Sequence, residues 1–507
     1  MNTYLFSANL EGIHSAITGV EVNIRRGIPT FTIIGLAATC IKESTDRIRV
    51  AMENSGFEFP MQRILVNLSP AGVRKEGSWF DLPICAGILV AGKFVEVSIN
   101  LEEYLFLGEL GLDGSIRPMK GLINILINLK DSIIKNVVIP EENKLEASFV
   151  KDINIFPISH ILELEKIFTK QKESYVIDYT PRQEERKPGK FFLFEKQLLG
   201  LRALSIALSG KHHILFLGSP GTGKTMLARL SSELQPPLNE AEFLDLLRVK
   251  SKMELMSKES AFEFTRPFRS PHHTASDISM VGGGRDIRMG EVSLAHNGIL
   301  FLDELGEFSP GVLQALREPL EEGKVTISRV NGHYTYPASF MLIAASNPCP
   351  CGYFGNNEKN CLCSATRIQR YLSRFSGPFL DRIDLQVEMS YTAATGKKVE
   401  VDLAEIFQTI CAAKEIQNIR FNYSAKAFNG LMSGKECLDY FTVDKKALRV
   451  WENLEKSMEI GIRKMNKIRK LSRTIADMDA SEYIREEHVL EALHFSRGIE
   501  SVFERAA

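Results

Sequence analysis

One short stretch limits what this chain can fold into more than any other part of the sequence. It begins at Gly218 and ends at Thr225, and it fits the pattern G-x-x-x-x-G-K-T of a loop that cradles phosphate groups. Residues 214–217 before it are all apolar, as in a buried parallel strand, and residues 225–233 after it have a helical pattern. The loop is therefore predicted to join a strand to a helix N-terminus, where backbone N–H groups and the helix dipole favour bound anions.

This loop predicts a binding site for ATP with Mg²⁺. Lys224 is expected to reach the β- and γ-phosphates, and the Thr225 hydroxyl is expected to ligate Mg²⁺. The alternative is a chance match in a glycine-rich turn, and the flanking strand and helix argue against it. The residues expected to bind the nucleotide are Gly218, Ser219, Pro220, Gly221, Thr222, Gly223, Lys224, Thr225 and Met226.

Two further apolar runs end in polar residues of the type that ATP hydrolysis requires. Residues 298–302 lead into Asp303 and Glu304. Asp303 is expected to hold Mg²⁺, and Glu304 to polarise the attacking water, although paired acids can also cap a helix. Residues 340–345 lead into Asn347, which is expected to orient the water or the γ-phosphate unless it only forms a turn before Pro348. The sequence therefore predicts three strand ends that meet at one catalytic site.

Composition sets the outer limits. The 507 residues predict two to four domains, and 44% hydrophobic with 25% charged residues is ordinary for a globular chain. The net charge of -1 means that any contact with nucleic acid is local. No secretory signal is visible, and the longest apolar run, near residues 83–92, is too short to span a bilayer. We expect a cytoplasmic protein without membrane contact.

A cysteine cluster follows the third apolar run. Its members form two C-x-C pairs that can fold into a tetrahedral thiolate site, for which Zn²⁺ is the best candidate in a structural role. Four reduced thiols in a loop are the alternative, and His272 with His273 lacks companion ligands for a metal. The expected zinc ligands are Cys349, Cys351, Cys361 and Cys363.

Outside these motifs the chain has an α/β pattern at its N-terminal end and a helical pattern at its C-terminal end. Strands are predicted over residues 16–24, 29–34 and 64–68, and helices over 41–55, 81–91, 197–209, 448–480 and 487–497. Residues 169–190 combine prolines with mixed charge and are typical of a linker.

Several stretches resemble one family closely. The N-terminal region contains Val-Asn-Leu-Ser-Pro-Ala at residues 66–71 and Lys-Glu-Gly-Ser-Trp-Phe-Asp-Leu-Pro at residues 75–83. Together with the ATP-site motifs, these resemble the magnesium-chelatase-like AAA+ proteins of the ComM/YifB family, from Phe6 to about Arg497. The resemblance implies a Lon-protease-like α/β domain over residues 1–168, the linker over 169–190, an AAA+ core with a parallel sheet over 191–395, and a helical lid over 396–507.

The resemblance also implies roles for three arginines. Arg382, in the segment Leu-Asp-Arg-Ile-Asp, resembles the arginine that enters the neighbouring subunit's ATP site, and Arg374 is the second choice. Arg473 resembles the sensor 2 arginine of the lid. Their alternatives are a local salt bridge with Asp381 or Asp384 and a solvated basic helix face. An arginine finger in trans implies a homo-oligomer, usually a hexameric ring.

Two segments are candidates for contact with a DNA backbone. An arginine- and glycine-rich insertion lies between Lys224 and Asp303, and a predicted β-hairpin with Asn-Gly at its turn covers residues 323–337. A surface loop and a purely structural hairpin are the alternatives. The candidate DNA contacts are Arg266, Arg269, Arg285, Lys324 and Arg329.

Two functions follow from this resemblance. The first is an ATP-dependent DNA motor, since the ComM branch drives branch migration in recombination and natural transformation. The second is a protein-remodelling, chelatase-like or chaperone-like ATPase, with a protein partner bound through the N-terminal domain. A peptidase is not expected, because Ser78 and Lys120 lack the sequence setting of a Lon Ser–Lys pair.

Overall fold

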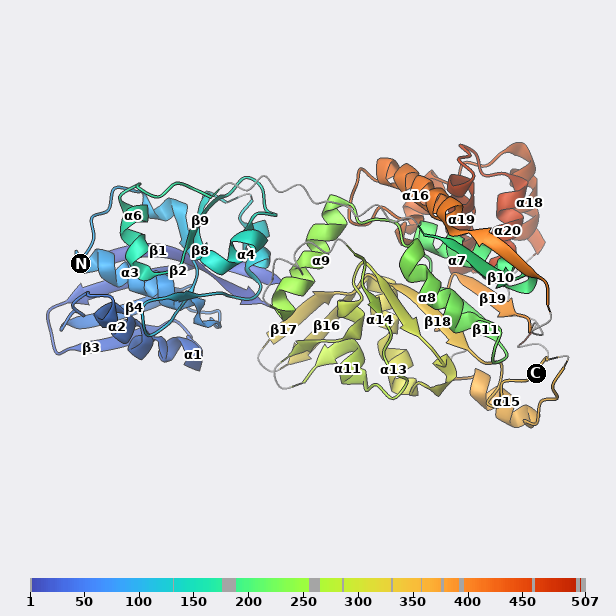
Figure 1. Cartoon of the computed structure of the whole chain (residues 1–507), viewed down its shortest axis with the longest axis horizontal. Helices are drawn as coiled ribbons and strands as arrows, with labels where there is room; N and C mark the ends of the chain where they lie inside the picture. Colours follow the sequence, from blue (N-terminus) through green and yellow to red (C-terminus); the bar gives the residue numbers. More distant parts are fainter. Residues whose placement is uncertain are drawn as a thin grey trace. The chain divides into compact units, whose positions relative to one another are not determined.

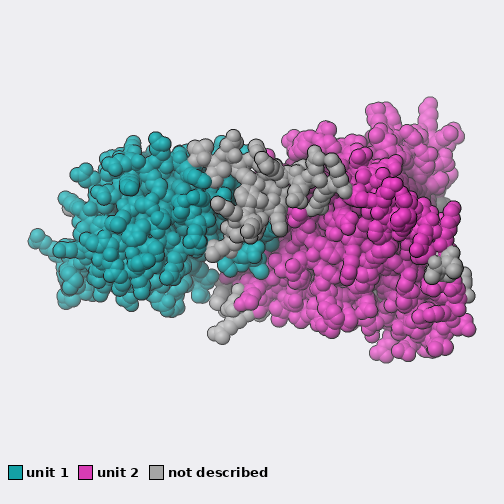
Figure 2. All heavy atoms as spheres, viewed as in Figure 1, with its two compact units in different colours: residues 1–182, 247–263 teal, residues 183–246, 264–507 magenta. Residues whose placement is uncertain are grey.

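The chain folds into two compact units, each of which is described by itself (Figures 1 and 2). Unit 1 comprises residues 1–182 and 247–263, and unit 2 comprises residues 183–246 and 264–507. None of the helices in the described part of the chain is both long and apolar enough to cross a membrane. The computed structural model describes residues 2–130, 132–175, 188–254, 265–284, 287–329, 332–356, 358–374, 378–391, 396–457, 461–497 and 502.

Unit 1 is built on a mixed seven-stranded sheet in the order β3-β4-β2-β1-β5-β8-β9. Antiparallel pairing joins β1 to β2 and β2 to β4, whereas β5, β8 and β9 run parallel. The strands of unit 1, within and outside this sheet, are β1 (Asn2–Glu11), β2 (His14–Arg25), β3 (Thr30–Ile34), β4 (Arg63–Ser69), β5 (Tyr104–Phe106), β6 (Glu109–Leu110), β7 (Ile116–Arg117), β8 (Asn136–Pro140) and β9 (Asn154–Ile158).

The helices of unit 1 cover this sheet. The most buried of them is α3, which lies so close to β2 that a Cβ atom at Gly87 would stand 2.5 Å from a methyl of Val22. The predicted helix 41–55 is divided at Glu43 into two helices. The helices are α1 (Thr39–Lys42), α2 (Ser44–Asn54), α3 (Asp81–Ala91), α4 (Leu122–Asn128), α5 (Lys144–Ala147) and α6 (Leu164–Phe168).

Unit 1 also contains a segment that is distant in sequence. Helix α9 (Glu240–Met253) enters this unit at residue 247, and Ser251 there donates a hydrogen bond to the buried carboxylate of Glu146. The backbone N–H of Gly121 donates to the Ser251 carbonyl at 2.9 Å, and Asn124 donates to the Arg248 carbonyl at 3.0 Å. The sequence predicts a contiguous domain over residues 1–168, whereas the compact unit needs this later segment as well.

The two residues considered for a Lon-type pair have separate partners in unit 1. The Ser78 hydroxyl donates to Glu109, and the Lys120 ammonium donates to the Met253 carbonyl at 2.9 Å. The Ser–Lys hydrogen bond that peptide hydrolysis by such a pair requires is therefore not formed between them.

Unit 2 contains a parallel five-stranded sheet in the order β12-β15-β18-β11-β19. This confirms the expected α/β fold with a parallel AAA-type sheet. The strands of unit 2 are β10 (Lys190–Phe194), β11 (Ile214–Gly218), β12 (Phe268–Arg269), β13 (Gly282–Gly283), β14 (Arg288–Met289), β15 (Ile299–Leu302), β16 (Lys324–Arg329), β17 (Gly332–Pro337), β18 (Met341–Ser346), β19 (Leu385–Met389) and β20 (Lys398–Asp402).

The C-terminal helices share one apolar core with this sheet. Buried side chains of β11, such as Phe216, join Leu403, Trp451 and Ile468 of the helical region in the same cluster. The helices of unit 2 outside α9 are α7 (Leu198–Gly210), α8 (Lys224–Leu234), α11 (Asp277–Val281), α12 (Glu291–Leu294), α13 (Pro310–Ala315), α14 (Arg317–Glu322), α15 (Ala365–Leu372), α16 (Leu403–Arg420), α17 (Gly434–Asp439), α18 (Lys445–Ser457), α19 (Ile462–Met478) and α20 (Glu486–Ser496).

The predicted single helix over residues 448–480 is wrong. The structure places two helices there, α18 and α19, and α19 begins after Gly461, whose backbone is extended. Both helices have a strongly one-sided apolar pattern, so periodicity alone joins them into one.

Candidate active site

Neighbouring strands bring the predicted ATP-site residues together. Because β15, β18 and β11 are adjacent and parallel, the residues that follow them meet at one edge of the sheet. The Lys224 ammonium donates to the carbonyls of Gly218 (2.6 Å) and Ser219 (3.0 Å) and to Asn347 Oδ1 (3.2 Å). The Thr225 hydroxyl donates to Asp303 Oδ2 at 2.9 Å. The site thus unites a phosphate-binding lysine with a hydroxyl, a carboxylate and an amide.

The phosphate-binding loop is supported by Gln197, a residue for which the sequence predicts no role. Gly221 and Gly223 have φ angles of +81° and +95°, which L side chains rarely adopt. Gln197 Nε2 donates to the Thr222 carbonyl at 3.0 Å, and a Cβ atom at Gly223 would stand 2.4 Å from that nitrogen. The loop is therefore held from outside by a side chain that precedes α7.

Thr225 and Asp303 fit a magnesium ion. Hydroxyl and carboxylate oxygens are the hard donors that Mg²⁺ takes, and here they already lie 2.9 Å apart. Thr225 and Asp303 would hold the ion there, and it would supply positive charge next to the β- and γ-phosphates of ATP.

Glu304 is held in an unusual conformation next to a histidine. Its φ and ψ of +51° and +48° fall in the left-handed region, which is uncommon for a residue other than glycine. His273 Nδ1 lies 3.1 Å from Glu304 Oε2, and the His272 ring packs at a tilt of 33° against that of His273, with centroids 4.2 Å apart. From the sequence, these histidines are candidates only for metal binding, whereas in the structure His273 is the neighbour of the expected catalytic carboxylate.

The environment of Lys224 predicts a pH dependence of ATP binding. Burial lowers the pKa of Lys224 to about 8, although the charge of Asp303 acts in the opposite direction. Bound phosphates favour the charged ammonium, so above pH 8 binding must take up a proton. The affinity for ATP should be nearly independent of pH around pH 7 and should fall by up to about tenfold per pH unit above pH 8. Titration with a fluorescent ATP analogue measures this.

The control for this prediction is Lys224→Arg, which keeps its charge over the whole range. If this variant binds ATP, its affinity for ATP should be the same at pH 7 and at pH 9. Equal affinity of the unmodified protein at pH 7 and pH 9 would contradict the prediction.

Both candidate arginine fingers are engaged within the subunit. Arg382 Nη2 lies 2.6 Å from Glu321 Oε1, and Nη1 donates to the Pro378 carbonyl. Arg374 Nη1 donates to the Gly306 carbonyl at 2.6 Å. A role of Arg382 in a neighbouring subunit therefore requires that it leave Glu321, and it remains a prediction.

Arg473 belongs to the packing of the lid. It is 4% exposed, and its guanidinium donates to Asp477 Oδ1 (3.1 Å) and to the carbonyls of Glu482 (2.9 Å) and Ser481 (2.6 Å). These contacts occupy three of its five N–H groups within the lid, and the expected role of Arg473 at the nucleotide remains a prediction. The helical pattern could not distinguish an arginine that faces phosphate from one that faces a buried aspartate.

Arg266 is not a DNA contact in this structure. Its side chain is buried, and it donates to the carbonyls of Pro236 (2.7 Å), Pro237 (3.1 Å) and Asn297 (2.8 Å) and to Glu242 (2.9 Å). A guanidinium with this set of partners has no donor left for a phosphate. Its role is to neutralise the buried carboxylate of Glu242.

The other candidate DNA contacts differ in accessibility. Arg269 is half-exposed and forms a two-bond pair with Glu291 at 2.7 and 2.8 Å. Lys324 is exposed, and its ammonium lies 3.1 Å from Glu322. Arg285 lies outside the described residues, and so does the side chain of Arg329.

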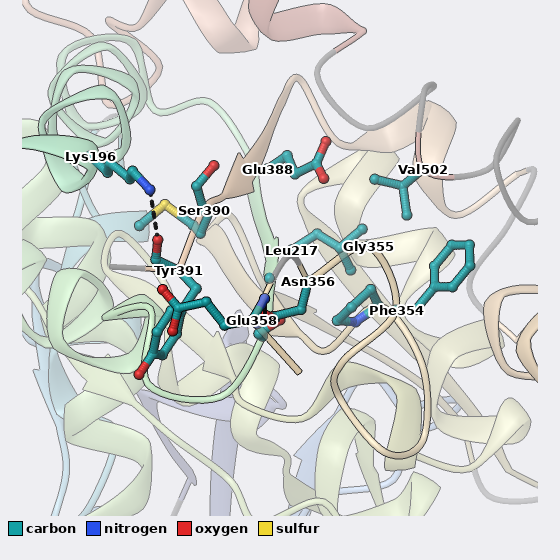
Figure 3. A pocket seen from close by; sticks show the side chains of 14 residues that line it. Lys196, Leu217, Phe354, Gly355, Asn356, Glu358, Glu388, Ser390, Tyr391 and Val502 are labelled. Atoms are coloured by element: carbon teal, nitrogen blue, oxygen red, sulfur yellow. Dashed lines mark hydrogen bonds between the residues drawn. The ribbon is translucent and has the colours of Figure 1, made fainter. Parts of the chain in front are cut away.

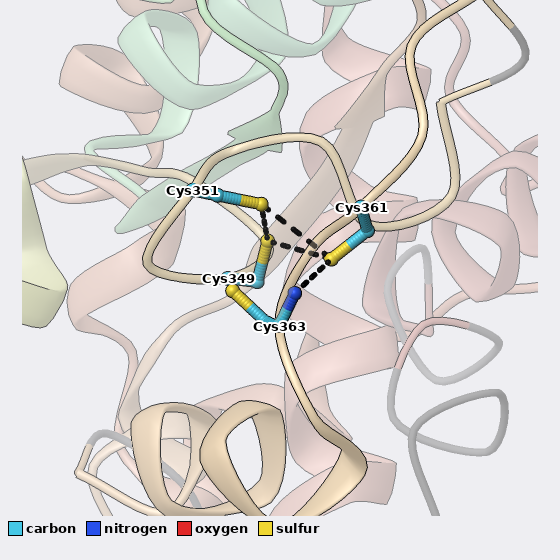
Figure 4. A group of neighbouring side chains, drawn as sticks. All are labelled: Cys349, Cys351, Cys361 and Cys363. Carbon is cyan, nitrogen blue, oxygen red and sulfur yellow. Dashed lines mark hydrogen bonds between the residues drawn. The ribbon is translucent and has the colours of Figure 1, made fainter.

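The expected cysteine ligands converge after β18 (Figure 4). The sulfur of Cys349 lies 3.3 Å from that of Cys351 and 3.6 Å from that of Cys361, and all four cysteine sulfurs lie within 4.8 Å of one another. Zinc–sulfur bonds of about 2.3 Å in a tetrahedron place thiolates about 3.8 Å apart. The cluster therefore has the dimensions of a Cys₄ zinc site with no open position.

Backbone N–H groups support the same interpretation. The N–H of Phe354 donates to Cys349 Sγ at 3.3 Å, and the N–H of Cys363 donates to Cys361 Sγ at 3.5 Å. Burial opposes ionisation of Cys351, but backbone N–H groups outweigh it and lower its pKa to about 6, whereas burial raises the pKa of Cys349 to about 12 and also raises the pKa of Cys361. Such donors stabilise the thiolate form that binds metal.

A cleft lies beside the phosphate-binding loop (Figure 3). The loop contributes Gly218 and Ser219, and the segment after the first cysteine pair contributes Phe354 and Asn356. Its other side is formed by Lys196, which donates to the Tyr391 carbonyl at 3.0 Å, and by the end of β19. Its position predicts that it receives the nucleoside part of a bound nucleotide.

Three family descriptions match the chain in consecutive segments. Residues 194–397 match "Magnesium chelatase, subunit ChlI", residues 20–143 match "Subunit ChlI of Mg-chelatase", and residues 401–496 match "Magnesium chelatase, subunit ChlI C-terminal". The first of these covers the sheet of unit 2 and the whole ATP site.

Curated relatives are similar over nearly the whole length. Competence protein ComM of Haemophilus influenzae is 38% identical, with 97% of this chain and 96% of ComM covered. The protein YifB of Salmonella typhimurium is 37% identical, with 96% and 95% covered. Lon protease 2 of Bacillus subtilis is 28% identical over 193 residues, which are 34% of this chain and 35% of that protein.

Proposed function

Since the chain belongs to the ComM/YifB family of magnesium-chelatase-like AAA+ ATPases, we propose that it is a ring-forming motor that couples ATP hydrolysis to movement of DNA. The reaction would be helicase action or branch migration in recombination or natural transformation. The observation that carries this proposal is the hairpin of β16 and β17, which directly precedes the strand that positions Asn347.

The hairpin has one buried and one outward face. Val325 and Ile327 of β16 are buried, whereas Lys324, Thr326 and Ser328 between them are exposed. Thr326 pairs with Thr335, and Ser328 pairs with His333, so the outward face is polar on both strands. A polar face with a lysine, connected to the ATP site through β18, suits contact with a phosphate backbone.

A ring is supported by the family and by the proposed finger. The AAA+ chelatase family is typically oligomeric. A ring would also give Arg382 a role, because it resembles an arginine that enters a neighbouring subunit's ATP site; to do so it would leave Glu321. We propose a hexamer, as the family resemblance implies.

The DNA assignment predicts that the hairpin lysine sets the response to DNA. ATP turnover is measured with single-stranded, duplex and four-way-junction DNA at several salt concentrations. DNA should stimulate the unmodified protein, and Lys324→Ala should need severalfold more DNA for the same stimulation. Its salt dependence should be shallower by about one unit of slope, because one phosphate contact is lost.

Lys435→Ala provides the matched control, since Lys435 is exposed on α17 rather than on the hairpin. It should respond to DNA as the unmodified protein does. Equal losses in both variants would mean that the hairpin has no special role.

A protein substrate is the second candidate, and the edge of the unit 1 sheet favours it. Strand β3 is the terminal strand of that sheet, and Ile34, Leu36, Ile28 and Met61 around it are 45%, 60%, 83% and 78% exposed. Exposed apolar side chains beside an unpaired edge are typical of a docking surface. This candidate would be favoured if the protein hydrolyses ATP at a substantial rate and none of the DNA substrates alters that rate.

A further inference from the structure

The segment between the two cysteine pairs touches the phosphate-binding loop. Asn356 Nδ2 donates to Ser219 Oγ at 3.1 Å, although the two residues are 137 positions apart in sequence. Gly352, with φ of +83°, lies against Pro220, where an added Cβ atom would stand 2.7 Å from the proline ring. The thiolate cluster and the nucleotide site thus share one short stretch of chain.

This stretch forms a wall of the nucleotide cleft. Phe354, Gly355, Asn356 and Glu358 line the cleft (Figure 3), together with Gly218 and Ser219 of the phosphate-binding loop. The carboxylate of Glu358 is suited to hydrogen bonds with the hydroxyls of a ribose or the edge of a base, whereas the Asn356 amide bonds to Ser219 and to the backbone N–H groups of Glu358 and Lys359. If the stretch moves away, the phosphate-binding loop remains but the cleft loses this side.

Little besides the cysteines fixes the stretch. No helix or strand lies among the described residues between Ser346 and Ala365. The local hydrogen bonds are short-range: Gly352 N–H donates to the Cys349 carbonyl at 2.9 Å and Asn356 N–H to the Tyr353 carbonyl at 3.1 Å. Asn356 Oδ1 accepts from the N–H groups of Glu358 and Lys359 at 2.7 and 3.0 Å. Leu362, between the second pair of cysteines, is 90% exposed and therefore contributes no core packing.

A metal ion supplies the missing constraint. Thiolates only 3.3 to 3.6 Å apart repel one another unless a cation lies between them. A zinc ion would remove this repulsion and close the loop from Cys349 to Cys363 at both ends, which is how structural zinc contributes to folding.

We propose that zinc bound by Cys349, Cys351, Cys361 and Cys363 holds Asn356 against the phosphate-binding loop, so that nucleotide affinity depends on the metal. This inference rests on the proposed ATP site and adds a regulator to it. The zinc-free protein should retain its two folded units but bind nucleotide at least about tenfold more weakly. Asn356→Ala should bind nucleotide about three- to tenfold more weakly while it keeps its zinc, because it loses the hydrogen bond to Ser219 and the two that Asn356 Oδ1 accepts from the N–H groups of Glu358 and Lys359.

The test uses the full-length protein and measures its zinc content and its thermal unfolding. It also measures the dissociation constant of an ADP analogue that carries a fluorescent group on its ribose. The samples are the purified protein, the same protein after a chelator and after zinc is restored, Cys351→Ser with Cys361→Ser, and Asn356→Ala. Cys411→Ser is the matched control, because Cys411 is a free cysteine of α16 outside the cluster. We expect about one zinc per chain, lost only in the double variant and after chelation.

The outcomes separate this inference from the proposed function. Nucleotide affinity that is unchanged in the zinc-free protein, or in Asn356→Ala with full zinc occupancy, would overturn the coupling while the ATPase assignment stands. Absence of nucleotide binding by the zinc-loaded protein would instead remove the ATPase assignment itself. Should the double cysteine variant fail to fold, the Asn356→Ala result still decides the question.

Discussion

Glu304→Gln should bind ATP as tightly as the unmodified protein and hydrolyse it about 10²- to 10⁴-fold more slowly. The amide has the size of the carboxylate but cannot accept a proton from the attacking water or polarise it equally. The contacts that bind the phosphates come from Lys224 and Thr225, which the substitution does not touch. Single-turnover hydrolysis and nucleotide binding, measured on the same preparation, check both parts.

The chain offers a matched control for Glu304→Gln. Glu307 lies three positions later, carries the same carboxylate and is 3.9 Å from Arg374 rather than beside His273. Glu307→Gln should keep nearly full turnover. Normal hydrolysis by Glu304→Gln would show that the catalytic carboxylate has been assigned wrongly, whereas equal loss in both variants would indicate a general disturbance of this loop.

Arg382→Ala should lower ATP turnover by about 10³-fold or more if the arginine stabilises the transition state in a neighbouring subunit. Mixing it with Lys224→Ala should restore turnover. A subunit with Lys224→Ala binds no ATP but still presents Arg382, and a subunit with Arg382→Ala provides an intact ATP site. With random mixing of equal amounts, roughly a quarter of the sites pair the two correctly, since each condition holds with a chance of one half.

Two controls separate the finger from a structural role. Glu321→Gln removes the ion pair that Arg382 makes within its own subunit, so it should not reproduce the loss of turnover. Arg374→Ala tests the second-choice arginine, whose guanidinium donates to the Gly306 carbonyl. If the mixture remains inactive and Glu321→Gln behaves as Arg382→Ala does, Arg382 acts within its own subunit.

The geometry of the nucleotide site could be predicted from sequence for a physical reason. Lys224, Asp303 and Asn347 each follow an apolar run, and such runs form parallel strands whose carboxyl ends share one edge. The pattern of apolar runs therefore predicts where these three side chains lie as well as their residue types. The same periodicity predicted strands β11, β15 and β18 of the unit 2 sheet and helices α7, α8 and α20, but not the outer strands β12 and β19.

Contacts between distant segments could not be predicted in this way. Arg266 has the local pattern of an exposed, phosphate-binding arginine, but its buried partner Glu242 lies 24 positions earlier in helix α9. Likewise, nothing near Asn356 or His273 in the sequence indicates a partner at Ser219 or Glu304. Burial and pairing of these side chains depend on the tertiary fold, which a local pattern does not contain.

The composition of unit 1 from two separate stretches affects how it can be made on the ribosome. Residues 1–182 leave the ribosome first, and domains generally begin to fold as soon as they are available. Ser251 is synthesised only after the strand and helix that carry the phosphate-binding loop, so Glu146 lacks this buried donor until then. Unit 1 can therefore complete its folding only after the strand and helix that carry the phosphate-binding loop have been synthesised.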